Sequence, residues 1–575
     1  MKRTGTSTDG KRTLRVSAAI IALLAVGVRL YVLHVSHTTT EDFFITLRYA
    51  RNLAAGRGFV YNPGEHVLGA TSPLYTLLLA GFYRLGLDAG LAGKALNILA
   101  DAGVCIGLCI FFDGLGQPRA GRIAALLYAA TSAPVNFACG GMETGLVSLA
   151  EVLAIGAYAA LKEKALWAWL AVLVLLRIDG LALGAVLLIA LKLGRRPMHW
   201  QAALPPSAVV GAWVAFAWVY FGSPLPNSVV AKLVAYGHLR SAGALPNLPE
   251  FVTQFAKGPF QMALLAAFAW GAVFAWTRMP AMRPPLVWMF LYYGVMLASR
   301  VPAFGWYFVP GLPVYYGVAA VGMASAVSRL EASLTRRAGV GRCGATLEGL
   351  LGAVLLAHVP AVARDVARAQ ALEDQVRRPI GQWLAGNTRP SDRVLLEPLG
   401  YIGYYSGRPM IDAVGIVSPQ VLRFYRAGSR DPLADMIAAF HPEYVLLGRG
   451  DVDRLGLMGS MKGDVDIRSR YHFVRAWPDA RSGPVYFLFR RNDYGAAAHR
   501  NIRRPLQRPI RQRLRPHPSG RAQWDHRGNA DPGLACRDAR VEAEALQVPV
   551  ATGGGSCAVR LLEGLLGSEK PLLLS

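Results

Sequence analysis

"SAAIIALLAVGVRLYVLHV" (residues 17–35) is followed almost at once by "TTTEDFFITLRYARNLAAGRGFVYNPGEHVLGATSPLY" (residues 38–75), and this junction decides the fold. The first run has the length and composition of a helix that crosses a bilayer core about 30 Å thick. The second run begins with adjacent threonines and acids and continues through several arginines to a Pro-Gly turn. A loop that only connected two membrane spans would need none of this, so the pattern favours a function for the first loop.

The composition of the whole chain is that of a membrane protein. Of its 575 residues, 53% are hydrophobic and only 17% are charged, and the mean hydropathy is +0.32. A soluble enzyme of this length would carry more charge and fewer uninterrupted apolar runs. Further apolar runs lie at 72–88, 91–112, 122–138, 143–161, 165–191, 204–221, 260–277, 285–299, 303–326 and 345–362. We therefore predict a polytopic α-helical membrane protein with about 10–11 membrane segments.

The formal net charge of +25 sits largely in segments that flank the apolar runs and in the C-terminal tail. Such basic segments follow the positive-inside rule and indicate membrane orientation, not nucleic-acid binding. The basic leader, residues 1–15, is therefore predicted in the cytoplasm. The basic loops predicted on the same side are at 192–197, 277–285 and 329–342.

This orientation predicts a transmembrane domain at 16–362 in the cell (inner or plasma) membrane, whose first loop, 36–71, lies on the extracytoplasmic side. Everything after residue 363 falls on that side as well. Between 72 and 143 the parity of the spans does not close, so one of those runs must be irregular. We expect the active site and the C-terminal domain on the extracytoplasmic side.

The run at 165–191 carries charge in its middle, where Arg177 and Asp179 stand in "RIDG". Basic residues flank both ends, and each half is about a dozen residues, or roughly 17 Å of helix, too short to cross. We predict a re-entrant or kinked hairpin whose charged tip meets a wet cavity, because charge at that depth must face protein or water.

After residue 363 the composition becomes polar and strand-like runs appear. The stretch "ARDVARAQALEDQVRRPIGQWLA" predicts an amphipathic helix. The stretches "RVLLEPLGYIGYYSG", "PEYVLLGRG", "YHFVRAW" and "VYFLFRR" predict strands separated by Pro, Gly and Asp. These features predict a small external α/β domain at 363–492. The Arg-, Pro- and Gly-rich segment at 493–575 is predicted to be disordered.

The first loop permits a structural and a chemical interpretation. Structurally, Thr40 caps a helix, and Glu41 and Asp42 complement its positive end. Chemically, these acids could deprotonate a hydroxyl, while Arg48 and Arg51 hold a phosphate through charge-assisted hydrogen bonds. For each arginine the alternative is pairing with the acids or snorkelling to the interface.

Several motifs in the chain resemble those of one family. The first loop is similar to that of the GT-C membrane glycosyltransferases, and most similar to the branch of the actinobacterial terminal β-1,2-arabinofuranosyltransferases. The further matching motifs follow in the same order and are "GGMETGL" (140–146), "RIDGL" (177–181), "YFGSPLPNSVVAKL" (220–233), "WYFVPGLP" (306–313) and "LGYIGYYSGRPMIDAVGIVSP" (399–419). The resemblance covers about residues 15–492.

This resemblance implies an inverting transfer of a sugar from a polyprenyl phosphate to an acceptor hydroxyl on the outer face. An acid that opens the first loop is the expected general base. The family more often has two aspartates there, whereas this chain has Glu41 and Asp42, and either could take the proton. The nearest sugar is arabinofuranose, and the acceptor could be a glycan, a lipid or a protein.

The remaining motifs supply candidate binding residues. Glu143 is a candidate for binding a sugar or acceptor hydroxyl, or else a first-turn helix acid. Arg177 and Asp179 are candidates for substrate binding, or else pair with each other. Lys232 could meet the donor phosphate or anchor a loop.

Trp306 and Tyr307 could stack on a sugar or belong to the aromatic belt of the membrane interface. The sequence does not define a metal site. Glu41, Asp42 and Asp179 could bind a divalent cation, but no spacing motif requires one. No cofactor is predicted with certainty.

Two other functions remain open at this point. A transporter or flippase of a lipid-linked sugar would share the lipid groove, but the chain shows no internal repeat, and a large external domain is unusual for such carriers. A non-catalytic scaffold would have no reason to keep the acids and arginines of the first loop.

Overall fold

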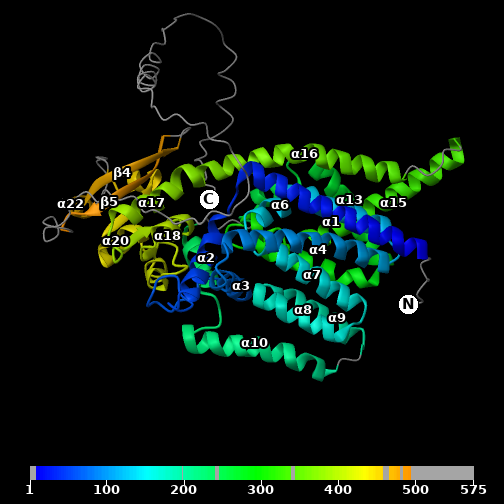
Figure 1. Cartoon of the computed structure of the whole chain (residues 1–575), viewed down its shortest axis with the longest axis horizontal. Helices are drawn as coiled ribbons and strands as arrows, with labels where there is room; N and C mark the ends of the chain where they lie inside the picture. Colours follow the sequence, from blue (N-terminus) through cyan, green and yellow to red (C-terminus); the bar gives the residue numbers. More distant parts are fainter. Residues whose placement is uncertain are drawn as a thin grey trace, which may run out of the picture. The chain divides into compact units, whose positions relative to one another are not determined.

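The computed structural model describes residues 8–493 apart from 197–198, 240–244, 339–343, 458–464 and 480–482. Its first part is a bundle of helices (Figure 1). They are α1 (Thr8–Ser36), α2 (Glu41–Ala54), α3 (Pro73–Arg84), α4 (Ala89–Gly114), α5 (Pro118–Ala130), α6 (Ser132–Cys139), α7 (Thr144–Ala159), α8 (Glu163–Leu176), α9 (Gly180–Leu193), α10 (Trp200–Phe221), α11 (Asn227–Leu239), α12 (Leu248–Phe255), α13 (Pro259–Arg278), η1 (Pro280–Met282), α14 (Arg283–Ala298), η2 (Gly305–Tyr307), α15 (Leu312–Ala338) and α16 (Gly344–Leu372). The predicted tail lies outside the described residues apart from Asp493, and so do residues 1–7 of the predicted leader.

The outward surface of the bundle requires a membrane. Five helices among the described residues are long and apolar enough to cross one: Gly10–Ser36, Ala89–Gly114, Trp200–Phe221, Pro259–Arg278 and Glu348–Asn387. In α10, Val219 is 86% exposed and Trp218 is 64% exposed. Large apolar side chains that face outward in this way need hydrocarbon around them. The chain is therefore a multi-pass membrane protein, as its composition predicted.

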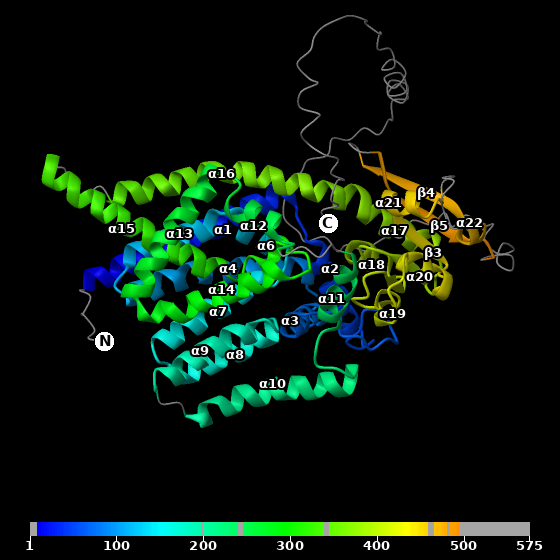
Figure 2. The same cartoon turned by 180° about the vertical axis from the view of Figure 1, so that it is seen from behind.

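The helical hairpin with a charged turn, predicted within 165–191, is present, whereas its re-entrant position and wet cavity stay predictions. Helices α8 and α9 have 14 residues each and are joined by a turn at residues 177–179. They lie side by side, and α10 packs against α8 (Figure 2). At about 1.5 Å per residue each helix is roughly 21 Å long, which is less than the thickness of a bilayer core of about 30 Å.

Helix α3 is the irregular run that disturbed the predicted parity. It has 12 residues, or about 18 Å, which is too short to cross. The C-terminus of α1 and the N-terminus of α4, which lie before and after α3 in the sequence, are at the same end of the bundle. This follows from a hydrogen bond that the Lys94 ammonium on α4 donates to the Thr38 carbonyl just after α1. The end of α6 returns to this same end, where the Thr40 amide donates to the Gly140 carbonyl. We call this end, which carries the first loop, the site end of the bundle.

The second part is an α/β domain built on a five-stranded sheet of order β2-β1-β3-β5-β4. The pairs β1–β2 and β1–β3 are parallel, and β3–β5 and β4–β5 are antiparallel. The strands are β1 (Val394–Leu396), β2 (Met410–Asp412), β3 (Tyr444–Gly448), β4 (Tyr471–Asp479) and β5 (Gly483–Arg491). The helical elements are the π-turn η3 (Glu373–Arg377), α17 (Arg378–Asn387), α18 (Gly400–Ser406), η4 (Pro419–Val421), α19 (Leu422–Arg426), α20 (Pro432–Phe440), α21 (Arg449–Arg454) and α22 (Val465–Arg470).

One prediction about this domain is confirmed and one is wrong. The helix predicted over "ARDVARAQALEDQVRRPIGQWLA" is present, since α16 continues through η3 into α17 without a break. The strand predicted over "GYIGYY" is a helix, α18, whose Gly400 and Gly403 lie against the first loop so closely that a Cβ would not fit.

The centre of the bundle is held by a buried ion pair. The Arg29 Nε on α1 lies 2.6 Å from the Asp101 Oδ2 on α4, and both side chains are at most 1% exposed. The Tyr128 hydroxyl donates to the other oxygen of Asp101 at 2.9 Å. The Arg29 guanidinium also donates to the carbonyls of Ala25 and Ala129. Helices α1, α4 and α5 are thus joined by charge that is shielded from lipid on every side.

Removing one member of this pair should destabilise the protein far more than removing both. Arg29→Met leaves the Asp101 carboxylate buried without its cation, and we expect it to cost about 3–5 kcal/mol of unfolding free energy. The double variant Arg29→Met/Asp101→Leu should recover most of that loss. Both can be measured by thermal unfolding of the purified protein in detergent.

The control is Arg368→Met, which breaks a pair with Asp365 whose side chains are 64% and 72% exposed. This variant should unfold at the wild-type temperature, because exposed ion pairs contribute little. Equal destabilisation of the Arg29 and Arg368 variants would contradict a special role for the buried pair.

Candidate functional site

One acid of the first loop faces a lysine across the site end. Asp42 stands in the first turn of α2, and its Oδ2 lies 3.8 Å from the Lys232 Nζ on α11. The same ammonium donates to the Tyr307 hydroxyl at 3.1 Å. The Asp42 side chain is 28% exposed and that of Lys232 is 13% exposed. The carboxylate is therefore the more accessible member of the pair.

Three aromatic rings surround the Lys232 ammonium. The ring centroids of Phe304, Trp306 and Tyr307 lie 5.0, 5.7 and 5.5 Å from its Nζ, and the rings of Phe304 and Trp306 stack with centroids 4.7 Å apart. Cation–π attraction stabilises the charge where water is scarce. Burial lowers the pKa of Lys232, but Tyr307 and Asp42 raise it by more, so its pKa lies above the ordinary value. Lys232 is therefore a cation at neutral pH.

The tip of the hairpin adds a second cation to the same place. The Arg177 guanidinium forms bonds of 2.7 and 3.1 Å to the two oxygens of Asp179, and a longer one of 3.4 Å to Glu143 at the start of α7. The guanidinium also lies 5.5 Å from the centroid of the Tyr307 ring, so Arg177 and Lys232 both contact this ring. The Asp179 side chain is 32% exposed, whereas that of Arg177 is only 9% exposed.

The structure thus brings together seven of the ten residues predicted from the sequence. Contacts join them in one chain: Asp42, Lys232, Trp306, Tyr307, Arg177, Asp179 and Glu143. The motifs that carry them are up to 265 residues apart, since they run from 42 to 307. The roles predicted for these residues stay predictions. What the structure establishes is that Asp42 lies next to Lys232, and that Lys232 shares the Tyr307 ring with a second cation, Arg177.

Glu41 faces the opposite way from Asp42. Its Oε1 accepts the Gly400 amide at 2.5 Å and its Oε2 accepts the Tyr401 amide at 3.0 Å. The Arg377 Nη1 lies 4.0 Å from Oε2. Burial raises the pKa of Glu41, and Arg377 partly offsets this. Both of its oxygens are therefore committed to the C-terminal domain.

The two arginines of α2, Arg48 and Arg51, also face the C-terminal domain. Arg48 is 2% exposed, and its guanidinium donates to the carbonyls of Tyr61, Gly403 and Arg408 at 2.6–3.0 Å. Arg51 is half-buried, donates to the Tyr404 carbonyl at 3.1 Å and lies over the Tyr404 ring. This placement leaves Arg48 unsuited to a donor phosphate, so we do not carry that prediction into the site.

Sequence reasoning missed residues that line the same region. Tyr236 stands one helical turn after Lys232 on α11, and its ring lies 6.2 Å from that of Phe304. Glu397 follows β1 at the carboxyl end of that strand, where ligands often bind in parallel sheets. Burial and the charges of Asp412 and Asp451 raise the pKa of Glu397 to about 7. The only sequence feature that could have pointed to Tyr236 was its spacing of one helical turn from Lys232.

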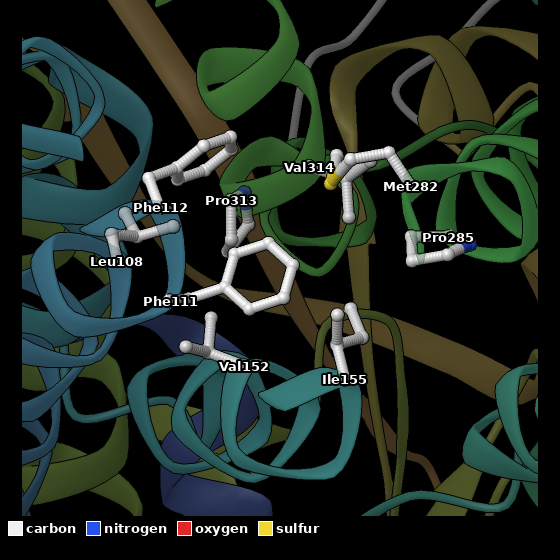
Figure 3. Close-up of a pocket in the computed structure, with 9 residues that line it drawn as sticks. All are labelled: Leu108, Phe111, Phe112, Val152, Ile155, Met282, Pro285, Pro313 and Val314. Atoms are coloured by element: carbon white, nitrogen blue, oxygen red, sulfur yellow. The ribbon is translucent and has the colours of Figure 1, made fainter. Parts of the chain in front are cut away.

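A hollow elsewhere in the bundle is apolar. It lies between α4, α7, η1, α14 and α15, has a cavity volume of about 20 Å³ and is lined by nine apolar residues (Figure 3). No group there can transfer a proton or hold a phosphate. Among the described residues no group of three or more His, Cys, Asp or Glu is placed to hold a metal ion.

Comparisons with known proteins agree with this fold. The crystal structure of ArnT from Cupriavidus metallidurans bound to undecaprenyl phosphate superimposes with a TM-score of 0.51 and 15% identity, over 82% of this chain and 97% of that one. The chain is also 36% identical over 123 residues to the terminal β-(1→2)-arabinofuranosyltransferase of Mycobacterium tuberculosis. That match covers 19% of this chain and 18% of the relative.

A family described only as a domain of unknown function, DUF8728, matches residues 365–496. This range contains the whole α/β domain described above. The similarity to ArnT shows that the two proteins share a fold over most of their lengths.

The two arginines of α2 offer a matched test of their placement. Arg48→Gln removes three bonds to carbonyls and leaves those carbonyls buried, so it should cost about 2–4 kcal/mol of unfolding free energy. Arg51→Gln, on the same helix but half-buried, should cost under half as much. Thermal unfolding and the rate of proteolysis of the C-terminal domain measure both. A stable Arg48→Gln protein that has lost affinity for a lipid phosphate would instead support the phosphate role.

Proposed function

We propose that this protein is an integral membrane glycosyltransferase that moves a sugar from a polyprenyl-phosphate donor to an acceptor hydroxyl, with inversion. The observation that carries the proposal is the Asp42 carboxylate 3.8 Å from Lys232, beside Arg177 on the shared Tyr307 ring. A base next to two cations is what displacement of a phosphate by an alcohol needs. The fold shared with a protein solved with undecaprenyl phosphate supports a lipid-linked donor.

The reaction assigns one task to each group. Asp42 accepts the proton of the acceptor hydroxyl as its oxygen bonds to the anomeric carbon of the sugar. The bond between that carbon and the phosphate oxygen breaks on the opposite face, which inverts the configuration. The polyprenyl phosphate leaves with the bonding electrons and gains negative charge. Lys232 and Arg177 stabilise that charge as it forms, more strongly than they bind the ground state.

Asp42 is a better base than Glu41 on geometry. Both oxygens of Glu41 already accept backbone amides. Asp42 keeps part of its carboxylate accessible, and one of its oxygens faces Lys232. A base has to reach the substrate hydroxyl before its pKa matters. We therefore propose Asp42 as the group that accepts the proton.

The donor sugar and the orientation rest on the sequence. The motifs that resemble the arabinofuranosyltransferase branch, together with the local likeness to the mycobacterial enzyme, support arabinofuranose as the sugar. The basic loops support an extracytoplasmic site in the inner or plasma membrane. The acceptor would be a hydroxyl of a glycan, a lipid or a protein.

Replacing the two acids separately tests the assignment. In membranes supplied with a polyprenyl-phosphate arabinofuranose, Asp42→Asn should lower the transfer rate by about 10²–10⁴-fold, because the base is lost while the shape is kept. Glu41→Gln should lower it less, since the amide can still accept a backbone hydrogen bond. Labelled sugar in the acceptor fraction is the readout.

The exposed Asp365→Asn serves as the control and should keep wild-type turnover. Wild-type turnover in Asp42→Asn would overturn the assignment of the base. If the wild-type protein moved labelled donor across sealed vesicles without any transfer to an acceptor, the carrier function would replace the proposed one.

A further inference from the structure

The first loop and the C-terminal domain meet along a continuous seam at the site end. Glu41 accepts the two amides that begin α18, so a carboxylate from one part of the chain caps a helix from another, 359 residues later. An acid at this position complements the positive end of a helix. Because Asp42 directly follows Glu41, the same contact constrains where the Asp42 backbone lies.

Two glycines of α18 let it approach the first loop closely along this seam. A Cβ at Gly400 would lie 2.2 Å from the Glu41 carbonyl oxygen, and one at Gly403 would lie 1.8 Å from the Tyr61 hydroxyl oxygen. The first distance is to backbone, so only a movement of α18 away from the first loop can relieve it, whereas the second requires either that movement or a displacement of the Tyr61 ring. The Phe44 ring of α2 then packs on the rings of Tyr401 and Tyr404, with centroids 4.3 and 4.9 Å away.

Hydrogen bonds on both sides of the glycines complete the seam. The Tyr61 hydroxyl donates to the Leu399 carbonyl at 2.7 Å. The Asn62 side-chain amide donates to the Met410 carbonyl at 2.9 Å and accepts the Met410 amide at 3.0 Å. Arg48 adds its bond to the Gly403 carbonyl at 2.6 Å. The seam therefore holds the beginning and the end of α18.

Arg377 ties this seam to the last membrane helix. It stands on η3, where α16 passes into α17, and its Nη1 lies 2.6 Å from the Glu373 carboxylate and 4.0 Å from that of Glu41. Its Nε donates to the Tyr486 hydroxyl on β5 at 3.3 Å. A shift of the C-terminal domain would therefore be transmitted to Glu41.

We propose that the C-terminal domain positions the Asp42 carboxylate, with Glu41 as the positioning residue and the glycine face of α18 as its support. This inference rests on the proposed function. Without the cap on α18, the first turn of α2 loses its external anchor and Asp42 departs from its distance to Lys232. Small displacements of a reacting group reduce rates strongly, because the transition state requires a near-attack geometry. The C-terminal domain thus affects the rate of sugar transfer by positioning the first loop.

A double-mutant cycle distinguishes positioning from an independent role. Glu41→Gln should lower kcat by about 10- to 100-fold with little change in KM, because Asp42 remains but is displaced. Since Glu41 acts only through Asp42, Glu41→Gln/Asp42→Asn should be no slower than Asp42→Asn alone. Losses that multiply in the double variant would overturn the positioning role. Wild-type turnover in Asp42→Asn would overturn both the assignment of the base and the positioning role, whereas a wild-type protein without any sugar transfer would overturn the proposed function itself.

A second pair of variants tests the seam without touching any charge. Gly403→Ala should separate α18 from the first loop and lower kcat in the wild-type background by about tenfold or more, but have no further effect in Asp42→Asn. Gly386→Ala, on α17 of the same domain, meets nothing within 4 Å and should leave the rate unchanged. Melting temperatures are recorded for both. Wild-type kcat in a folded Gly403→Ala protein would contradict the proposal.

Discussion

Charge that lies within or beside a membrane has to find a partner, and this constraint organises the molecule. Water is not available to solvate a lone ion at that depth. Arg29 and Asp101 satisfy each other in the middle of the bundle. At the site end, Arg177 pairs with Asp179, and Lys232 faces Asp42. The first pair joins helices, whereas each of the other two leaves a carboxylate partly exposed.

This difference in exposure separates charged side chains that hold the fold together from those that remain accessible. Glu41 and Asp42 are neighbours in sequence and similar in chemistry, yet one is committed to backbone amides and the other is accessible. The same holds for the arginines, since Arg48 holds carbonyls of the C-terminal domain while Arg177 lies at the site.

Much of the fold could be predicted from local pattern. Apolar runs identified the membrane helices, and charge in the middle of one run identified the hairpin at 177–179. The prediction was wrong for "GYIGYY", because strand propensity depends on tertiary context, and here the segment is a helix that packs on the first loop. The domain boundary at 363 stays a prediction, placed where the composition changes within the continuous helix α16.

The sequence by itself determined the membrane class, the order of the motifs and which residue types could carry the chemistry. These follow from hydropathy and from residue identity, which are local properties. Only the tertiary structure decided that Asp42 rather than Glu41 faces Lys232, and that Tyr307 lies beside two cations. Such choices depend on contacts between segments hundreds of residues apart, as with Glu41 and Gly400. A local sequence pattern cannot predict the orientation of a side chain that is set by hydrogen bonds to the backbone amides of a distant helix.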